Sequence, residues 1–190
     1  NPAITLGFLA ARRIEPLMAG IYVCAQILGA IAAAYVLKAT LPADLFAATR
    51  GGGQAISLDV SAPQAFSLEL IATFLLTFVV FATAVDPDAP RVGGFAIGLT
   101  YGANMLAIGS FTGGSMNPAR SLGPAVASGI FEGQAVYWAG PVVGAIIAAV
   151  VYNQLLMRRE PELPLHGAVR AEEPPPETAP PPPSARVRKK

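Results

Sequence analysis

The chain has 190 residues, 53% of them hydrophobic and only 13% charged, with a mean hydropathy of +0.51 and a net charge of +1. These values exclude an ordinary water-soluble domain, and the small net charge gives no indication of a nucleic-acid partner. A single cysteine, Cys24, excludes a disulfide or a multi-cysteine metal site within one chain. The composition predicts an all-α protein that crosses a membrane several times.

The chain opens on Asn1-Pro2-Ala3, followed by an apolar stretch that ends at Arg12 and Arg13. Asparagine is a good helix N-cap and proline fits the first helical position, so a helix is predicted over residues 1–11. It is too short to span a bilayer, and we expect a half-helix that re-enters from the side carrying the arginines, which is the cytoplasmic side. Because the sequence starts inside this motif, without a methionine, we expect that an earlier part is missing.

Two complete spans are predicted next, over residues 17–37 and 63–85, separated by a long hydrophilic loop on the opposite face. The first span carries Gln26, which we interpret as an interhelical hydrogen-bonding residue rather than a pore ligand. The second carries Glu69, and a carboxylate within a span is by default a functional-site hypothesis. We favour a scaffold role, in which Glu69 accepts hydrogen bonds from backbone N–H groups of a re-entrant loop, over ion transport.

A third span is predicted over residues 92–108, after which the chain unwinds into a second copy of the opening motif. This stretch reads Gly113, Gly114, Ser115, Met116, Asn117, Pro118, Ala119 and Arg120. Asn117 and Pro118 predict the start of a second half-helix over residues 117–128. Residues 92–119 are uncharged, so this start lies at membrane depth, where irregular backbone survives only if protein buries it or it lines a wet cavity. Paired interrupted segments indicate an inverted repeat with its site near the bilayer midplane.

The last span is predicted over residues 133–157 and ends at Arg158 and Arg159. Four crossings separate this arginine pair from the first one, so both pairs lie on the cytoplasmic side. Residues 158–190 are rich in proline, glutamate and basic residues, which predicts a disordered cytoplasmic tail. A solvated tail is favoured over a ligand for an SH3-type domain, and the basic residues at its end could contact anionic lipid weakly.

The two half-helices are expected to meet head to head, so that each N-terminus directs about half a positive charge at one point of the lumen. A cation there is repelled. A water molecule whose oxygen accepts from the amides of both Asn1 and Asn117 must point its hydrogens along the pore, which interrupts a proton wire. Arg120 adds a second electrostatic barrier at a constriction. Glu69 has no histidine, cysteine or second carboxylate near it in sequence, which argues against an enzyme.

These residues resemble the aquaporin, or major intrinsic protein, family. The resemblance is close over residues 113–124 and 1–5, extends through Gln26, Glu69 and the Gly140-Pro141 pair, and covers the chain to about Met157. It implies six membrane helices and two half-helices in an inverted repeat, of which the first two membrane helices are missing here. It also implies a homotetramer with one pore per subunit and no cofactor or metal.

In this family the narrowest filter has four positions, and this chain supplies three of them: Met105, Gly114 and Arg120. The fourth lies on the missing second span. The resemblance also implies a ladder of carbonyl acceptors for passing water, formed by Gly113, Gly114, Ser115 and Met116. Strict water channels commonly have histidine at the position of Met105, so this filter is expected to be apolar and wide. It is more similar to plant vacuolar members that are associated with small neutral solutes such as ammonia or urea.

Four further positions match water channels rather than glycerol facilitators: Ser121, Ala125, Tyr137 and Trp138. An interfacial aromatic anchor remains an equal alternative for Tyr137 and Trp138. The sequence therefore predicts a passive, non-enzymatic pore that conducts water across the plasma or inner membrane. The close alternative is a facilitator for glycerol, urea or ammonia. A membrane scaffold or junction protein is the alternative from another class.

Overall fold

The computed structural model describes residues 1–157, which contain helices and no strand. Four of the described helices are long and apolar enough to cross a membrane. They are α2 (Pro16–Thr40), α4 (Ala62–Val80) with the π-helical turn η2 (Phe81–Val85), α5 (Gly93–Thr112), and α7 (Gln134–Val151) with the π-helical turn η3 (Tyr152–Leu156). The predicted fold class, an all-α membrane protein, is confirmed. The proline-rich tail at 158–190 lies outside the described residues.

Two short helices, α1 (Pro2–Ala10) and α6 (Pro118–Ser128), begin at the two Asn-Pro-Ala motifs. The Oδ1 atom of Asn1 accepts from the N–H of Ala3 at 3.1 Å. The Oδ1 atom of Asn117 accepts from the N–H groups of Ala119 at 3.0 Å and Arg120 at 3.3 Å. Each asparagine therefore caps a half-helix with its side-chain oxygen, and the proline that follows occupies the first turn, where no backbone donor is needed.

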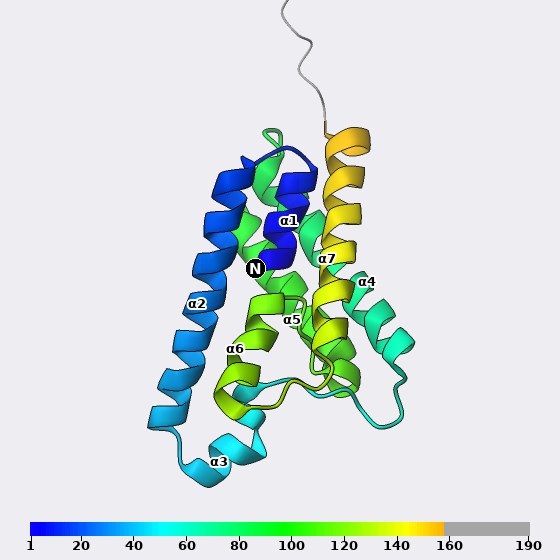
Figure 1. The fold of residues 1–190 in the computed structure, drawn as a ribbon. Coiled ribbons are helices and arrows are strands. Elements are labelled where there is room, and N and C mark those ends of the chain that lie inside the picture. The colour runs from blue at the N-terminus through cyan, green and yellow to red at the C-terminus, as the bar shows by residue number, and fades with distance from the viewer. Residues whose placement is uncertain (158–190) are drawn as a thin grey trace, which may run out of the picture. The chain divides into compact units, whose positions relative to one another are not determined.

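Figure 1 shows α1 and α6 running in opposite directions from the middle of the bundle. Helix α1 packs mainly against α7, and α6 packs mainly against α2. Both contacts are centred on a glycine six residues after the motif asparagine. A Cβ atom on Gly7 would lie 2.9 Å from the carbonyl oxygen of Ala145, and one on Gly123 would come even closer to that of Ala30. Each half-helix thus packs against the span that follows the other, as an inverted repeat requires.

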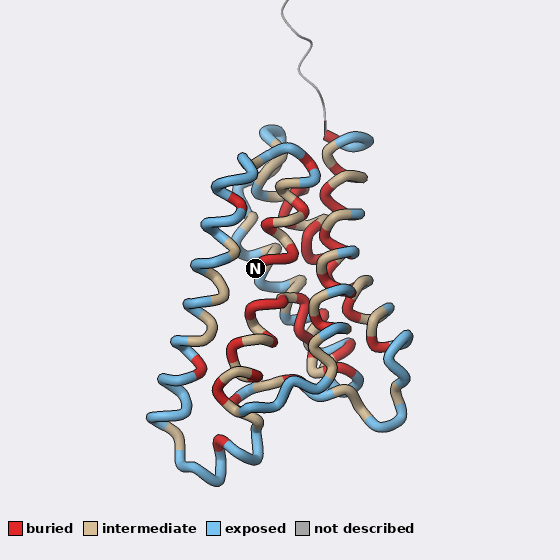
Figure 2. Tube along the Cα trace, in the orientation of Figure 1, coloured by how far each residue is buried: buried red, intermediate tan, exposed pale blue. Residues whose placement is uncertain are grey.

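Helices α4 and α7 form the other tight contact, in which glycines allow the two backbones to approach closely. A Cβ atom on Gly140 would lie 2.9 Å from the carbonyl oxygen of Phe66 and 3.0 Å from the Cβ atom of Glu69. Figure 2 shows burial concentrated where α1, α4, α6 and α7 meet, while α2 is exposed along most of its length. The buried share of the apolar window is only 11% in both α2 and α5. Their apolar surfaces are therefore available to lipid or to other helices.

Helix α5 continues to Thr112, beyond the end at residue 108 that the sequence indicated. Gly109 lies inside the helix, because an isolated glycine weakens a helix by only about 1 kcal/mol and need not end it. The helix ends at Gly113, whose φ of 77° is left-handed and whose N–H donates to the carbonyl oxygen of Gly109 at 2.9 Å. The irregular segment is accordingly shorter than expected.

The loop between α2 and α4 contains a short helix, α3 (Ala43–Ala48), and a 3-10 turn, η1 (Arg50–Gly52), neither of which the sequence analysis predicted. Phe46 of α3 is buried against Ala34 and Ala127. Its ring lies over Gly51, where a Cβ atom would be 2.6 Å from the ring and where φ is +63°. One apolar anchor therefore folds this loop onto α2 and α6, and a single buried aromatic in a mixed stretch has no periodicity to reveal it.

Candidate functional site

The two Asn-Pro-Ala motifs contact each other. The Nδ2 atom of Asn1 donates to the carbonyl oxygen of Met116 at 2.8 Å, although the two residues are 115 positions apart. This uses one of the two amide N–H bonds of Asn1 and leaves the other one free. The amide nitrogen of Asn117 donates to no atom of the described residues within hydrogen-bond distance. Both asparagines are half-buried. Two helix N-termini and three free amide N–H bonds thus lie close to one another.

The irregular segment between α5 and α6 turns through three left-handed residues. Gly113, Gly114 and Met116 have φ values of 77°, 58° and 51°. For the two glycines this conformation carries no steric penalty, whereas for Met116 it costs about 1–2 kcal/mol. Met116 is fully buried, so surrounding contacts must hold it in place.

Glu69 of α4 supplies those contacts. Its side chain is fully buried. One carboxylate oxygen accepts from the hydroxyl of Thr112 at 2.7 Å and from the N–H of Ser115 at 2.8 Å, and the other accepts from the N–H of Met116 at 2.7 Å. Both oxygens are therefore engaged by the irregular segment itself, and the carboxylate fixes the strained conformation of Met116.

Gln26 of α2 is attached to the first turn of α1. Its Nε2 atom donates to the hydroxyl oxygen of Thr5 at 2.9 Å, and that hydroxyl donates to the carbonyl oxygen of Asn1 at 3.1 Å. The hydroxyl of Ser121, at the corresponding position of α6, lies 3.4 Å from the carbonyl oxygen of Asn117. Both half-helices thus have a hydroxyl four residues after the asparagine that reaches back to its carbonyl.

Arg120 lies on the first turn of α6 and is held by the loop between α2 and α4. Its Nη1 atom donates to the carbonyl oxygen of Gly52 at 2.8 Å. Gln54 is buried beside it. With its amide oriented to satisfy both neighbours, its oxygen accepts from the Nε atom of Arg120 at 2.8 Å and also contacts the Nη1 atom. In the same orientation its nitrogen donates to the hydroxyl of Ser121 at 3.1 Å. Arg120 also borders a hollow of about 370 Å³ against the small residues Ala30, Ala33 and Ala34 of α2.

Met105 of α5 lies against Gly114. A Cβ atom on Gly114 would be 2.6 Å from the sulfur of Met105, so the methionine side chain occupies the space that a larger residue at 114 would need. Arg120 makes its hydrogen bonds with Gly52 and Gln54 rather than with this pair. Met105 and Gly114 thus form an apolar side of the site, and Arg120 provides a cationic group.

The four positions that match water channels rather than glycerol facilitators differ in their surroundings. Tyr137 is fully buried and its hydroxyl donates to the carbonyl oxygen of Thr112 at 2.8 Å. The alternative of an interfacial anchor is therefore wrong for Tyr137, because its ring is enclosed and its hydroxyl satisfies a carbonyl that the end of α5 leaves without a helical partner. Ser121 is buried in contact with the hydroxyl of Ser115. Ala125 is buried, and Trp138 is half-buried.

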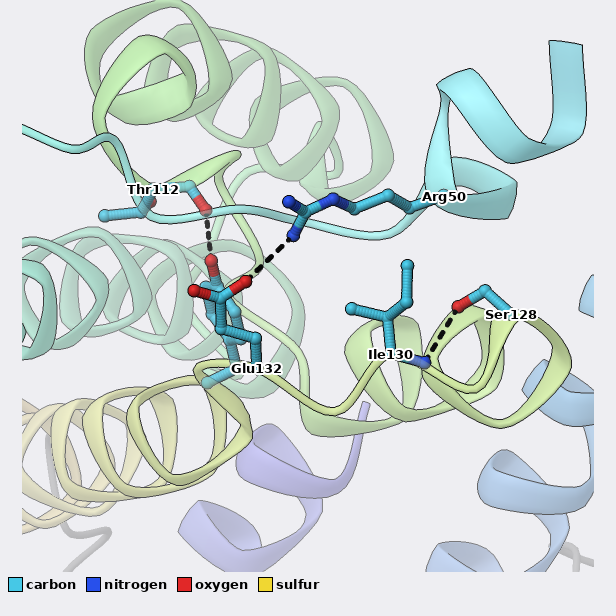
Figure 3. Close-up of polar contacts among 6 residues, drawn as sticks. Arg50, Thr112, Ser128, Ile130 and Glu132 are labelled. Atoms are coloured by element: carbon cyan, nitrogen blue, oxygen red, sulfur yellow. Dashed lines mark hydrogen bonds and ion pairs between the residues drawn. The ribbon is translucent and has the colours of Figure 1, made fainter. Parts of the chain in front are cut away.

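An ion pair joins the loop between α2 and α4 to the turn between α6 and α7. Arg50, next to Gly51 and Gly52, forms an ion pair of 3.3 Å with Glu132, which lies in the turn between α6 and α7 (Figure 3). Arg50 has a left-handed φ of 52°. The side chains of the pair are 36% and 75% exposed, so the pair adds little to stability but restrains the loop that carries Gln54.

Sequence reasoning missed Thr112, Gly52 and Gln54. Thr112 directly precedes the Gly113-Gly114 pair, and a hydroxyl beside a glycine turn is a usable signal for a loop contact. Gln54 follows three glycines in a loop, and no pattern distinguishes it from a solvated residue. Within residues 1–157 no group of three histidine, cysteine, aspartate or glutamate side chains is placed to hold a metal ion.

Comparison with known proteins gives one consistent result. The model of the Major intrinsic protein family matches residues 1–152. Aquaporin TIP1-2 of Zea mays is 44% identical over 169 residues, which cover 87% of this chain and 64% of that protein. Aquaporin TIP2-1 of Arabidopsis thaliana is 40% identical over 171 residues, covering 88% of this chain and 66% of that protein. The chain therefore spans a little under two thirds of the length of these relatives.

A solved structure has the same fold. The X-ray structure of the aquaglyceroporin from Plasmodium falciparum matches with a TM-score of 0.66 over 82% of this chain and 71% of that one. The sequences are 20% identical, so this likeness concerns the arrangement of the helices alone.

Proposed function

The chain belongs to the major intrinsic protein family, and we propose that it forms a passive pore that conducts water across a membrane and excludes ions and protons. The observation that carries this proposal is the hydrogen bond from Asn1 to Met116, which joins the two half-helix N-termini at one point. The names of the two plant relatives, both aquaporins, support it.

Cation exclusion follows from the electrostatics of that point. Each helix N-terminus carries about half a positive charge, and two such ends directed at one place repel a cation that has shed its water. Water does not meet this barrier, because its oxygen accepts from the free N–H bonds of Asn1 and Asn117. A water held by its oxygen from both sides directs its hydrogens away along the pore, so a proton cannot pass through it to the next water.

Water leaving this point needs acceptors, and the segment 113–116 offers them. The left-handed residues Gly113, Gly114 and Met116 turn successive carbonyl groups away from the helical direction. We propose that the carbonyls of Gly113, Gly114 and Ser115 form the acceptor ladder. The carbonyl of Met116 has a smaller share in it, since it already accepts from Asn1. The ladder replaces hydrogen bonds that a water molecule loses on leaving bulk water.

We propose that Met105, Gly114 and Arg120 belong to the filter that selects solutes. The sulfur of Met105 and the bare backbone of Gly114 form an apolar side, which offers no hydrogen bonds to a passing solute. The fixed guanidinium of Arg120 offers donors and repels cations. This combination supports a second candidate function, the passage of small neutral solutes such as urea, ammonia or glycerol alongside water.

The chain is a membrane protein with several apolar helices, and we propose that the turn around Arg12 and Arg13 lies on the cytoplasmic side of that membrane. The Nε atom of Arg13 donates to the side chain of Asn153 at 2.8 Å, so the end of α7 lies on the same face as that turn. We propose that the chain after this helix end is cytoplasmic as well. We also propose a homotetramer with one pore per subunit and no catalytic step.

Osmotic shrinkage of liposomes containing the full-length protein, followed by stopped-flow light scattering, tests the proposal. We expect fast water flux with a low activation energy. Replacing Asn117 by Asp keeps the helix cap but removes the amide donors and adds a negative charge, so cation leak through the same vesicles should rise. Water flux no faster than through bare lipid would overturn the proposal. Comparing the water and urea permeabilities of one preparation distinguishes the two candidate functions.

A further inference from the structure

The residue directly after the motif arginine, Ser121, is buried to 1% exposure although it is polar. Its hydroxyl contacts three groups: the hydroxyl of Ser115, the carbonyl oxygen of Asn117 and the amide of Gln54. Buried polar atoms are nearly always hydrogen-bonded. The Ser121 hydroxyl therefore limits which orientations its three neighbours can adopt without leaving a donor or an acceptor unpaired.

Gln54 is the connection between Ser121 and Arg120. An amide has a donor end and an acceptor end, so fixing one end fixes the other. Ser121 accepts from the amide nitrogen at 3.1 Å, which leaves the amide oxygen directed at the Nε atom of Arg120 at 2.8 Å. In the opposite orientation the amide nitrogen would face the guanidinium, and two donors would repel each other.

We propose that Ser121 is a positioning residue that acts through Gln54: its hydroxyl selects the orientation of the Gln54 amide, and the amide oxygen then holds the guanidinium of Arg120 in place. This inference rests on the proposed function only in that Arg120 is taken as part of the filter. The Nη1 atom of Arg120 also donates to the carbonyl oxygen of Gly52 at 2.8 Å, so this nitrogen contacts both Gly52 and the Gln54 oxygen. Loss of the Ser121 hydroxyl therefore loosens Arg120 without releasing it.

The backbone around Gln54 has little freedom to compensate. A Cβ atom on Gly113 would lie 2.9 Å from the Cβ atom of Gln54, so the Gln54 side chain is packed directly against the start of the irregular segment. The ion pair of Arg50 and Glu132 restrains the same loop from its outer side (Figure 3). The first atoms of the buried Gln54 side chain are therefore held against Gly113, which leaves rotation of the terminal amide as the change that Ser121 can select.

The test compares Ser121→Ala, Gln54→Leu and the double variant in the full-length protein, reconstituted in liposomes. Ser67→Ala is the matched control, because Ser67 is exposed on α4 and bonds only to its own helix. The direct measurement is solvent exchange of the Arg120 Nε–H, observed by NMR and assigned by its absence in Arg120→Lys. A hydrogen bond to a charged group is of the size that changes a population about tenfold, so Ser121→Ala should speed this exchange by about that factor. The control should leave it unchanged.

The double variant gives the decisive comparison. If Ser121 acts through Gln54, Ser121→Ala has no further effect on Nε–H exchange once Gln54 is leucine, and Ser121→Thr, which keeps the hydroxyl, behaves like the wild type. The ratio of urea to water permeability should change in the same order across the variants. Equal effects of Ser121→Ala with and without Gln54 would overturn the inference. Absence of water flux in the wild type would remove the proposed function, while the exchange measurement would still decide the role of Ser121.

Discussion

At the scale of single residues, Glu69 shows how a buried charge can have a structural use. Three donors, from Thr112, Ser115 and Met116, surround its carboxylate at 2.7–2.8 Å. A negative charge in apolar surroundings is tolerated when several donors satisfy it. The carboxylate therefore supplies the acceptors that the backbone N–H groups of the irregular segment lack, because these groups have no partners within a helix.

Replacing Glu69 by Gln keeps the size of the side chain but replaces one acceptor oxygen with a donor. That donor would face either the Met116 N–H or the Ser115 N–H, so at least one buried donor loses its partner. We expect a loss of about 1–3 kcal/mol in stability, or more because the lost partner was charged. Thermal unfolding in detergent measures it. Glu15→Gln, at an exposed position before α2, is the control, and equal Tm values for the two variants would contradict the assignment.

Gly114 provides a second prediction at this scale. Alanine there would place its methyl group 2.6 Å from the sulfur of Met105, at a φ of 58°. The left-handed conformation costs alanine about 1–2 kcal/mol, and the methionine must move aside. We expect Gly114→Ala to lower water permeability, and Met105→Ala in the same protein to restore most of it. Stopped-flow shrinkage measures both, and an unchanged flux in Gly114→Ala would show that this contact lies outside the pore.

At the scale of elements, two glycines decide how the half-helices are held. Gly7 packs on α7 and Gly123 packs on α2, in both cases against a backbone carbonyl. In a membrane no hydrophobic driving force holds two helices together, because lipid is as apolar as the helices. Their association depends on close packing, and glycine allows the two backbones to approach. The equivalent position of the two glycines gives the two half-helices the same mode of attachment.

Alanine at either glycine should therefore push a half-helix off its partner. We expect Gly7→Ala and Gly123→Ala each to destabilise the protein by about 1–3 kcal/mol through overpacking. Gly29→Ala is the matched control, since a Cβ atom there meets nothing within 4 Å and alanine favours a helix by up to about 1 kcal/mol. Thermal unfolding of the three variants is the measurement. A Gly29→Ala variant that is as unstable as the others would contradict the explanation.

The sequence was sufficient for some elements and not for others. Hydropathy located the four long helices, because length and lack of charge are enough to recognise a helix that can cross a membrane. Asparagine followed by proline located both half-helix starts. The end of α5 could not be placed, because Gly109 and Gly113 look alike in sequence and only the left-handed turn at Gly113 distinguishes them. Helix α3 depends on the burial of Phe46, a tertiary contact that no local pattern records.

At the scale of the whole molecule, the sequence predicted the part of the site that is repeated and missed the part that lies in an irregular loop. The two asparagines were identifiable as partners because the motif is repeated, and a repeat in a membrane protein implies symmetry. The loop residues that hold Arg120 were not, because Gly52 and Gln54 reach it through the fold of a segment without periodicity. Tyr137 was left undecided between an interfacial anchor and a position that discriminates subgroups. Its burial, with its hydroxyl on the carbonyl of Thr112 at the end of α5, is a tertiary contact that the sequence does not record.

The docking of α1 against α7 has a consequence for biosynthesis. The ribosome makes the first half-helix long before residues 134–151, the span on which it packs. Met116, which accepts from Asn1, is also made late, although before that span. We expect nascent chains released before Gln134 to leave α1 undocked. In a Cys24→Ser background, a cysteine introduced at Phe8, which packs against the buried cluster that contains Ala149 and Tyr152, should react with a water-soluble maleimide in chains released early and be protected in complete ones. Re-entry of the first half-helix would then be a late event in translation.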